Sequence, residues 1–204
     1  MMRFIQELSV LFEGVDFPWP ICGGLAVDLF LGRETRTHGD IDLSIAEPDR
    51  DKVIAHMLGK GWRVYEYRGG GVVRPVTGPE QSEPGRNLMC LRDGCELVKF
   101  YSFQEGLLYH EFVHTGMEKL DFLDLLFHPT EDVKPVLERD GIPFLAPEAV
   151  LLYKASDPER AENQRDFKNV YPMLNEKQRR WLHENLARIY PEHSWRLGEV
   201  DIIL

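Results

Sequence analysis

Residues 22–45 read CGGLAVDLFLGRETRTHGDIDLSI, and this stretch decides which fold and which kind of site the chain forms. A diglycine at 23–24 precedes an apolar segment that predicts a short helix ending at Gly32. The stretch DIDLSI alternates strictly, which predicts a strand with Asp40 and Asp42 on one face and apolar side chains on the other. A diglycine, a helix, a polar loop and an acidic strand therefore follow one another.

The two aspartates and the two glycines suit the chemistry of phosphate groups. Asp40 and Asp42 point the same way from a strand, so their carboxylates can share a hard cation such as Mg²⁺. Gly23 and Gly24 let the backbone approach another group closely, and amides at the N-terminus of the following helix can bind phosphate. Together they predict a site for a metal-bound nucleoside triphosphate, with in-line attack on a phosphorus. Either motif alone also has a structural explanation, as an edge strand or as a turn.

The remaining pattern predicts a mixed α/β unit followed by a helical unit. The first unit contains helix 3–12, helix 48–61, strand 62–67 and a β-rich region 87–127. Residues 68–86 include three consecutive glycines and three prolines, which predicts a mobile loop without regular structure. Residues 149–190 have helical periodicity, broken by prolines. We therefore expect an α/β domain over 1–146 and a helical domain over 147–204.

Composition excludes several classes of protein. The chain has 204 residues, 43% hydrophobic, which is enough for a sizeable core. A formal net charge of −10 argues against nucleic acid and anionic membranes as partners, and it suits a cationic small molecule or a metal-bridged substrate. No apolar run approaches the roughly 20 residues of a membrane span, and the first residues lack a signal pattern, so we expect a cytoplasmic protein. Cys22, Cys90 and Cys95 are too few and too irregular for a disulfide scaffold.

The chain also resembles a known family. The resemblance rests first on spaced glycines, arginines and aspartates, namely Gly23, Gly24, Asp28, Gly32, Arg33, Arg36, Asp40 and Asp42. Their spacing is similar to the signature of the aminoglycoside and lincosamide nucleotidyltransferases of the polymerase-beta-like superfamily. Residues 141–155 (GIPFLAPEAVLLYKA), 165–167 (RDF) and 181–186 (WLHENL) resemble 2''-adenylyltransferase-like proteins, and the resemblance is weakest between about 63 and 119. It implies an α+β fold in which a mixed sheet with flanking helices precedes a small C-terminal helical bundle.

The resemblance implies roles for particular residues. Asp40 and Asp42 would bind Mg²⁺, and the Gly23-Gly24 loop would hold the triphosphate of ATP or another nucleoside triphosphate. The resemblance also implies a third carboxylate on a later strand. As candidates for balancing the triphosphate charge we take Arg36 and Lys154, because cations beside developing phosphate charge are what this chemistry needs.

The third carboxylate has several candidates. The stretch LDFLDLLF contains Asp121 and Asp124, which lie on opposite faces of a regular strand, so both cannot serve. We choose Asp124, because a carboxylate inside an apolar run is costly without a metal or a partner. The stretch CELVKFY is the other candidate strand, with Glu96 two or three residues early and Lys99 or Val98 where a carboxylate is wanted. If that strand is the true equivalent, the third acid is missing and the site is impaired.

Some charged residues have structural explanations that compete with functional ones. Arg36 can be a surface loop charge, and Lys154 can pair with Asp166. We expect Asp28, on the short helix, to anchor Arg33 or Arg36 and not to touch substrate. Glu148 opens the first C-terminal helix, where an acid favours the helix dipole.

A competing motif is present at His110, Glu111 and His114, which match the H-E-x-x-H pattern of zinc hydrolases. That chemistry needs a helix, on which the histidines share a face and Glu111 activates a zinc-bound water. Here Gly106 and Gly116 bracket a stretch rich in β-forming residues. On a strand the two histidines would lie about 13 Å apart, at about 3.3 Å per residue, which is too far for one zinc ion.

We therefore expect a Mg²⁺-dependent nucleotidyltransferase that transfers a nucleoside monophosphate, AMP from ATP as the first choice, to a hydroxyl of a small acceptor. A cationic acceptor such as an aminoglycoside suits the acidic chain. Asp124 would bind the metal near the attacking hydroxyl and help to remove its proton. The acceptor would lie between the α/β unit and the helical unit. Three alternatives are a toxin–antitoxin-type nucleotidyltransferase acting on RNA or protein, a degenerate member that binds nucleotide without turnover, and the zinc hydrolase.

Overall fold

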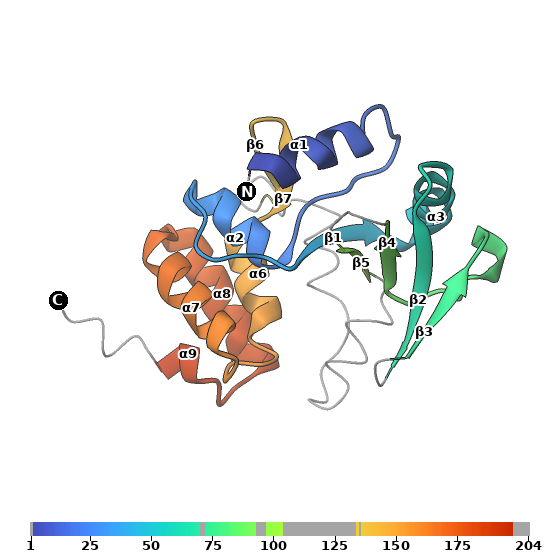
Figure 1. The fold of residues 1–204 in the computed structure, drawn as a ribbon. Helices are drawn as coiled ribbons and strands as arrows, with labels where there is room; N and C mark the ends of the chain where they lie inside the picture. Colours follow the sequence, from blue (N-terminus) through green and yellow to red (C-terminus); the bar gives the residue numbers. More distant parts are fainter. Residues whose placement is uncertain (1, 70–71, 93–96, 104–133, 135, 198–204) are drawn as a thin grey trace.

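A mixed sheet with helices beside it forms the first part of the molecule, and further helices follow it (Figure 1). The computed structural model describes residues 2–69, 72–92, 97–103, 134 and 136–197. The five-stranded sheet consists of β1 (Asp40–Ala46), β2 (Arg63–Gly69), β3 (Val72–Val76), β4 (Leu88–Leu91) and β5 (Leu97–Phe103), in the order β1-β5-β4-β2-β3. β1 and β5 are parallel and the other neighbours are antiparallel. The predicted α+β architecture with a mixed sheet is confirmed.

The helices flank this sheet and dominate the C-terminal part. They are α1 (Met2–Leu11), α2 (Gly23–Leu31), α3 (Arg50–Gly59), α6 (Pro147–Lys154), α7 (Ala161–Val170), α8 (Glu176–Ile189) and α9 (Ser194–Leu197). Short 3₁₀ turns are η1 (Glu47–Asp49), η2 (Pro79–Gln81) and η4 (Tyr171–Met173). A hairpin of β6 (Val136–Arg139) and β7 (Ile142–Leu145) precedes α6. None of the helices that the structure describes has the length and apolar character to cross a bilayer.

The predicted loop 68–86 is wrong in part, because it contains β3 and η2. β3 lies at the edge of the sheet, where Pro75 is tolerated because an edge strand need not donate every backbone N–H. The fully buried carboxylate of Glu66 on β2 fixes the following segment, since it accepts hydrogen bonds from the Ser82 hydroxyl at 2.9 Å and the Glu83 amide at 2.6 Å. Arg50 on α3 lies 3.5 Å from the same carboxylate. The segment is thus tied to the sheet.

A short extended segment before α2 joins the sheet to the hairpin. The Ile21 amide donates to the Pro143 carbonyl at 2.9 Å, and the Leu145 amide donates to the Ile21 carbonyl at 2.8 Å. On the other side, the Cys22 amide donates to the Asp42 carbonyl at 2.8 Å. These bonds place the start of α2 directly beside the middle of β1.

The C-terminal helices share a hydrophobic core with the α/β part. α6 packs against α2, α7 and α8, next to each other in Figure 1. One cluster of buried side chains includes Leu43 of β1, Leu25 of α2, Leu151 of α6 and Leu186 of α8. The division at residue 146 stays a prediction, although α6 begins at Pro147.

Candidate functional site

Asp42 and Gly23 meet where α2 begins beside β1. Along β1, the half-buried Asp40 and Asp42 alternate with the buried Ile41 and Leu43. Gly23 has a φ of +64°, which favours glycine. A Cβ at this position would overlap the Asp42 carboxylate. Glycine is therefore required here both by the backbone conformation and by the space that the carboxylate occupies.

The loop between α2 and β1 is fixed by the buried Asp28. Its carboxylate accepts hydrogen bonds from the Thr35 amide at 2.9 Å, the Thr35 hydroxyl at 2.5 Å and the His38 ring at 2.7 Å. Asp28 is thus an anchor, as predicted, but the predicted partners were wrong. Its side chain holds Thr35 and His38, and only its backbone carbonyl bonds Arg33, through the Arg33 amide. This anchoring positions Arg36, which lies between the two anchored residues.

Arg36 lies over the N-terminus of α2. A Cβ at Gly24 would overlap the Arg36 guanidinium, so a glycine at position 24 permits this approach. The first amides of a helix carry partial positive charge and lack partners within the helix. A guanidinium placed over them adds a second positive group, and the arrangement favours an anion.

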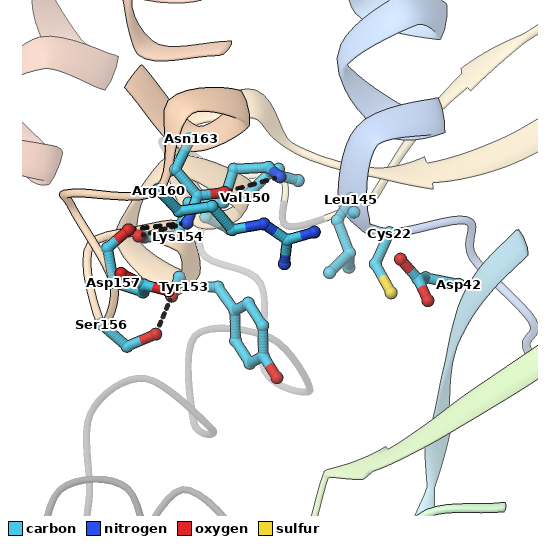
Figure 2. A pocket seen from close by; sticks show the side chains of 12 residues that line it. Cys22, Asp42, Leu145, Val150, Tyr153, Lys154, Ser156, Asp157, Arg160 and Asn163 are labelled. Carbon is cyan, nitrogen blue, oxygen red and sulfur yellow. Dashed lines mark hydrogen bonds between the residues drawn. The ribbon is translucent and has the colours of Figure 1, made fainter. Parts of the chain in front are cut away.

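Lys154 and Asp42 line the same cavity, from opposite sides (Figure 2). The cavity has a volume of about 160 Å³. Its lining residues come from the start of α2, β1, the end of β7, α6, α7 and the loop between these two helices; they are Cys22, Gly23, Asp42, Leu145, Ala149, Val150, Tyr153, Lys154, Ser156, Asp157, Arg160 and Asn163. Of the three predicted metal ligands, Asp42 lines the cavity, Asp40 is not among the lining residues, and Asp124 lies outside the described residues.

The ammonium of Lys154 is held from the side of α7. It lies 3.0 Å from the Asp166 carboxylate and donates to the Asn163 side-chain oxygen at 3.3 Å. The ion pair with Asp166, which sequence analysis gave as the structural explanation for Lys154, is therefore present. Lys154 also lines the cavity.

Arg160 is a cation of the site that sequence analysis missed. Figure 2 shows its guanidinium reaching into the cavity from the loop after α6, toward the side of Cys22 and Asp42. It forms an exposed ion pair with Glu162 at 3.3 Å. The pKa of the Glu162 carboxyl is lowered by its own backbone amide first, then by Arg160, with a smaller effect of Arg36. Three cations, namely Arg36, Lys154 and Arg160, thus lie near the start of α2 or the first turns of α7.

Sequence analysis did not predict Arg160, Tyr153 and Asn163 as site residues, because the local sequence does not indicate that these side chains face a cavity. Arg160 lies in a loop, where no periodicity shows which way a side chain points. Tyr153 and Asn163 belong to helical patterns whose usual explanation is packing. A charged residue between two predicted helices, close after Lys154, was the available hint.

All the candidates for the third carboxylate (Asp124, Asp121 and Glu96) lie outside the described residues, as does the H-E-x-x-H motif. Within the described part of the chain, no group of three or more His, Cys, Asp or Glu side chains could hold a metal ion. β5 is the parallel neighbour of β1, and its residue in register with Asp42 is Lys99. The stretch LVKFYSF of β5 contains no carboxylate.

Two buried titratable groups near the site have perturbed pKa values. Burial, and then the neighbouring Asp42 carboxylate, raise the pKa of the Cys22 thiol well above its ordinary range, so the thiol stays protonated at neutral pH. Burial also raises the pKa of Glu148 in the first turn of α6, although Gln178 donates to its carboxylate at 2.8 Å. Gln178 belongs to the capping box of α8 together with Asn175, so Glu148 links the starts of two helices.

Comparison with known proteins agrees with this fold. The family model described as aminoglycoside-2''-adenylyltransferase matches residues 5–71, which include Gly23, Gly24, Asp40 and Asp42. No curated protein matches the chain.

Three solved structures are similar over most of the chain. A solution structure of the antibiotic-resistance factor ANT(2'')-Ia is 16% identical, with a TM-score of 0.57 over 93% of this chain and 92% of that chain. A crystal structure of ANT(2'')-Ia with adenylyl-2''-tobramycin is 17% identical, with a TM-score of 0.55 over 91% and 97%. The lincosamide antibiotic adenylyltransferase LnuA, bound to lincomycin, is 16% identical, with a TM-score of 0.57 over 85% and 98%.

These likenesses define the class to which the fold belongs: it is the fold of the nucleotidyltransferases. Within that class, the predicted resemblance to the aminoglycoside and lincosamide nucleotidyltransferases is confirmed.

Proposed function

We propose that the protein is a Mg²⁺-dependent nucleotidyltransferase, which transfers a nucleoside monophosphate to a hydroxyl of a small cationic acceptor. The preferred donor in this proposal is ATP. One observation supports it above the others: Asp42 and Gly23 share a cavity with Lys154 and Arg160 on its opposite wall. A metal ion would bind the Asp42 carboxylate, and phosphate groups would bind the cations Lys154 and Arg160. A metal-bound triphosphate therefore fits between the two walls of the cavity.

The donors present fit a magnesium ion that protein and substrate hold jointly. Mg²⁺ is commonly bound by one or two carboxylates together with substrate phosphates and water. Asp40 and Asp42 offer two carboxylates at alternate positions of one strand, and Gly23, which lacks a Cβ, lets the Asp42 carboxylate lie against the start of α2. When bound, Mg²⁺ would neutralise phosphate charge and polarise the phosphorus under attack.

The phosphate chain would lie between the start of α2 and the helical wall. The amides at Gly23 and Gly24, with Arg36 above them, favour negative charge at the helix N-terminus. Lys154 and Arg160 would bind further phosphate oxygens from the opposite wall. These fixed charges would stabilise the transition state and the departing pyrophosphate.

The transfer requires a hydroxyl and a base. The acceptor oxygen would bond to the α-phosphorus, the bond from that phosphorus to pyrophosphate would break, and the hydroxyl proton would pass to a carboxylate. Asp124 remains our prediction for this base. Asp157 in the cavity lining and the net charge of −10 support a cationic acceptor, such as an aminoglycoside. The tobramycin product bound by ANT(2'')-Ia and the lincomycin bound by LnuA support an antibiotic as acceptor.

The proposal is tested by incubating the protein with Mg²⁺, ATP labelled at the α-phosphorus and a panel of aminoglycosides and lincosamides. We expect label in the acceptor and release of pyrophosphate. Asp42→Asn should lower the rate by at least about 100-fold, because the carboxylate that the metal requires is lost. Asp51→Asn, an exposed aspartate on α3, is the matched control and should keep the wild-type rate. Equal activity of wild type and Asp42→Asn would refute the assigned role.

Other outcomes of the same experiment identify the alternatives. Label in RNA or protein and none in small acceptors indicates a macromolecular substrate. Nucleotide binding without pyrophosphate release under any condition indicates a binding protein. The lack of a carboxylate in the β5 sequence, where Lys99 is in register with Asp42, would then explain the missing catalysis. Stoichiometric zinc in the purified protein indicates the hydrolase of the H-E-x-x-H motif.

A further inference from the structure

The ion pair of Lys154 and Asp166 is buried at the wall of the cavity. The two side chains are 10% and 0% exposed, and the ammonium nitrogen lies 3.0 Å from the carboxylate. Removing two charges from water costs free energy that their attraction often fails to recover. A well-packed apolar pair of similar size is commonly as stable or more so, so stability alone does not explain this pair.

The negative charge of the Asp166 carboxylate is compensated by Lys154. Within the described part of the chain, neither of its carboxylate oxygens accepts a hydrogen bond. A buried carboxylate without hydrogen bonds is costly. The Lys154 ammonium is therefore the group that compensates the charge of Asp166 there.

Asn163 fixes the direction of the same ammonium. Its side-chain amide donates to the carbonyls of Lys154 at 3.2 Å and Asp157 at 2.8 Å. These two bonds orient the amide, so that its oxygen faces the Lys154 ammonium and accepts a hydrogen bond at 3.3 Å. An ammonium has three N–H donors. Asp166 and Asn163 lie on the α7 side, which leaves a donor for the cavity that Lys154 lines.

We infer that Asp166 and Asn163 are positioning residues, which hold the Lys154 ammonium directed into the cavity for the phosphates of a nucleoside triphosphate. This inference rests on the proposed function. It assigns the buried pair to substrate binding, and it predicts that the two residues act on nucleotide affinity through Lys154 alone.

The first test measures binding of a non-hydrolysable ATP analogue with Mg²⁺ by calorimetry. Asp166→Asn and Asn163→Ala should each weaken binding, Asp166→Asn by about 10-fold or more, as for loss of one charge-assisted interaction. In kinetic assays both should raise the KM for nucleotide and leave the KM for acceptor unchanged. Arg165→Ala, an exposed residue next to Asp166 on α7, should match wild type.

The second test separates positioning from a purely structural role. The double variant Lys154→Met/Asp166→Leu replaces the ion pair by apolar side chains, and it should unfold at a midpoint as high as wild type or higher. Its affinity for the analogue should be below that of wild type and no lower than that of Lys154→Met alone, because Asp166 supports binding only through Lys154.

Distinct results overturn the inference and the proposed function. If wild type binds no nucleotide, the proposed function fails. If wild type binds but Asp166→Asn binds equally well, or the folded double variant keeps wild-type affinity, the positioning role is wrong. If Asp166→Leu weakens binding further in the Lys154→Met background, Asp166 does not act through Lys154 and the inference is also wrong.

Discussion

The carboxylate of Asp42 occupies the space that a side chain at Gly23 would need. The diglycine at 23–24 and the acidic strand that begins at Asp40 are therefore linked in the structure. The Asp42 carboxylate fits beside residue 23 only because that residue has no Cβ. The glycine also adopts a φ of +64°, so two independent constraints act on one position.

Gly23→Ala should therefore lose activity as well as stability. Gly14→Ala is the matched control, because Gly14 has a φ of +73° but open space around it. Both variants should lose about 1–2 kcal/mol of unfolding free energy from the left-handed backbone. Only Gly23→Ala should also displace Asp42 and weaken Mg²⁺-dependent nucleotide binding. Urea denaturation and calorimetry on both variants measure this; equal binding by the two would contradict a role of the Gly23–Asp42 contact.

Arg160 should contribute to nucleotide affinity. Its guanidinium reaches into the cavity and is paired with Glu162 at the protein surface, so it can exchange this partner for a phosphate. Arg160→Ala should raise the KM for nucleotide by about 3–30-fold. This is the effect expected from losing one charge-assisted hydrogen bond at an exposed or partly buried position. Arg165→Ala serves again as the exposed control. An unchanged KM would remove Arg160 from the site.

Two variants in the stretch LDFLDLLF test which residue is the third carboxylate of the site. If Asp124 accepts the hydroxyl proton, Asp124→Asn should lower kcat by about 100-fold or more, in the range for loss of a general base. Asp121→Asn should keep most of the activity, because the two aspartates are expected on opposite strand faces. The reverse pattern would assign the role to Asp121. Full activity in both variants would show that the third acid lies elsewhere or is missing.

Glu148 should make stability depend on pH. Burial raises its pKa in the folded protein above the ordinary value of 4.5. Folding thus favours the protonated carboxyl, and this contribution to stability is fully present below pH 4.5 and lost as the pH rises through the folded pKa. Glu148→Gln removes the titration, so its stability relative to wild type should increase from pH 4.5 to neutral pH.

Urea denaturation across this pH range measures the difference in unfolding free energy between Glu148→Gln and wild type. Glu176→Gln is the control, because Glu176 is an exposed glutamate in the first turn of α8. A flat difference for Glu148→Gln would show that burial does not perturb this carboxyl.

Local patterns predicted those elements whose residues carry a clear period or stop signal. The alternation of DIDLSIA matches β1, and the apolar run ending at Gly32 matches α2, whose C-cap glycine has a φ of +70°. The helical periods after residue 146 match α6, α7 and α8. In each case the residues that signal the element also bury its apolar face.

Elements and contacts that depend on residues distant in the sequence were not predicted. Pro75 and the glycine run suggested a loop, but β3 forms because an edge position next to β2 tolerates proline. The hairpin strand β6 and the short helix α9 have patterns too short for periodicity. At the site, nothing local reveals that Asp28 bonds His38, or that Arg160 reaches the cavity, because both depend on how the α2 and α6–α7 segments turn in space.

The unbroken cluster of buried side chains from Leu25 and Leu43 to Leu151 and Leu186 has a consequence for engineering. A break in the chain after Ala146 would divide that cluster between two fragments, and each would expose the apolar surface that the other covers. Neither fragment should be transplantable as a module. New acceptor specificity is therefore better sought by exchanging the loop between α6 and α7 than by recombining halves from different parents.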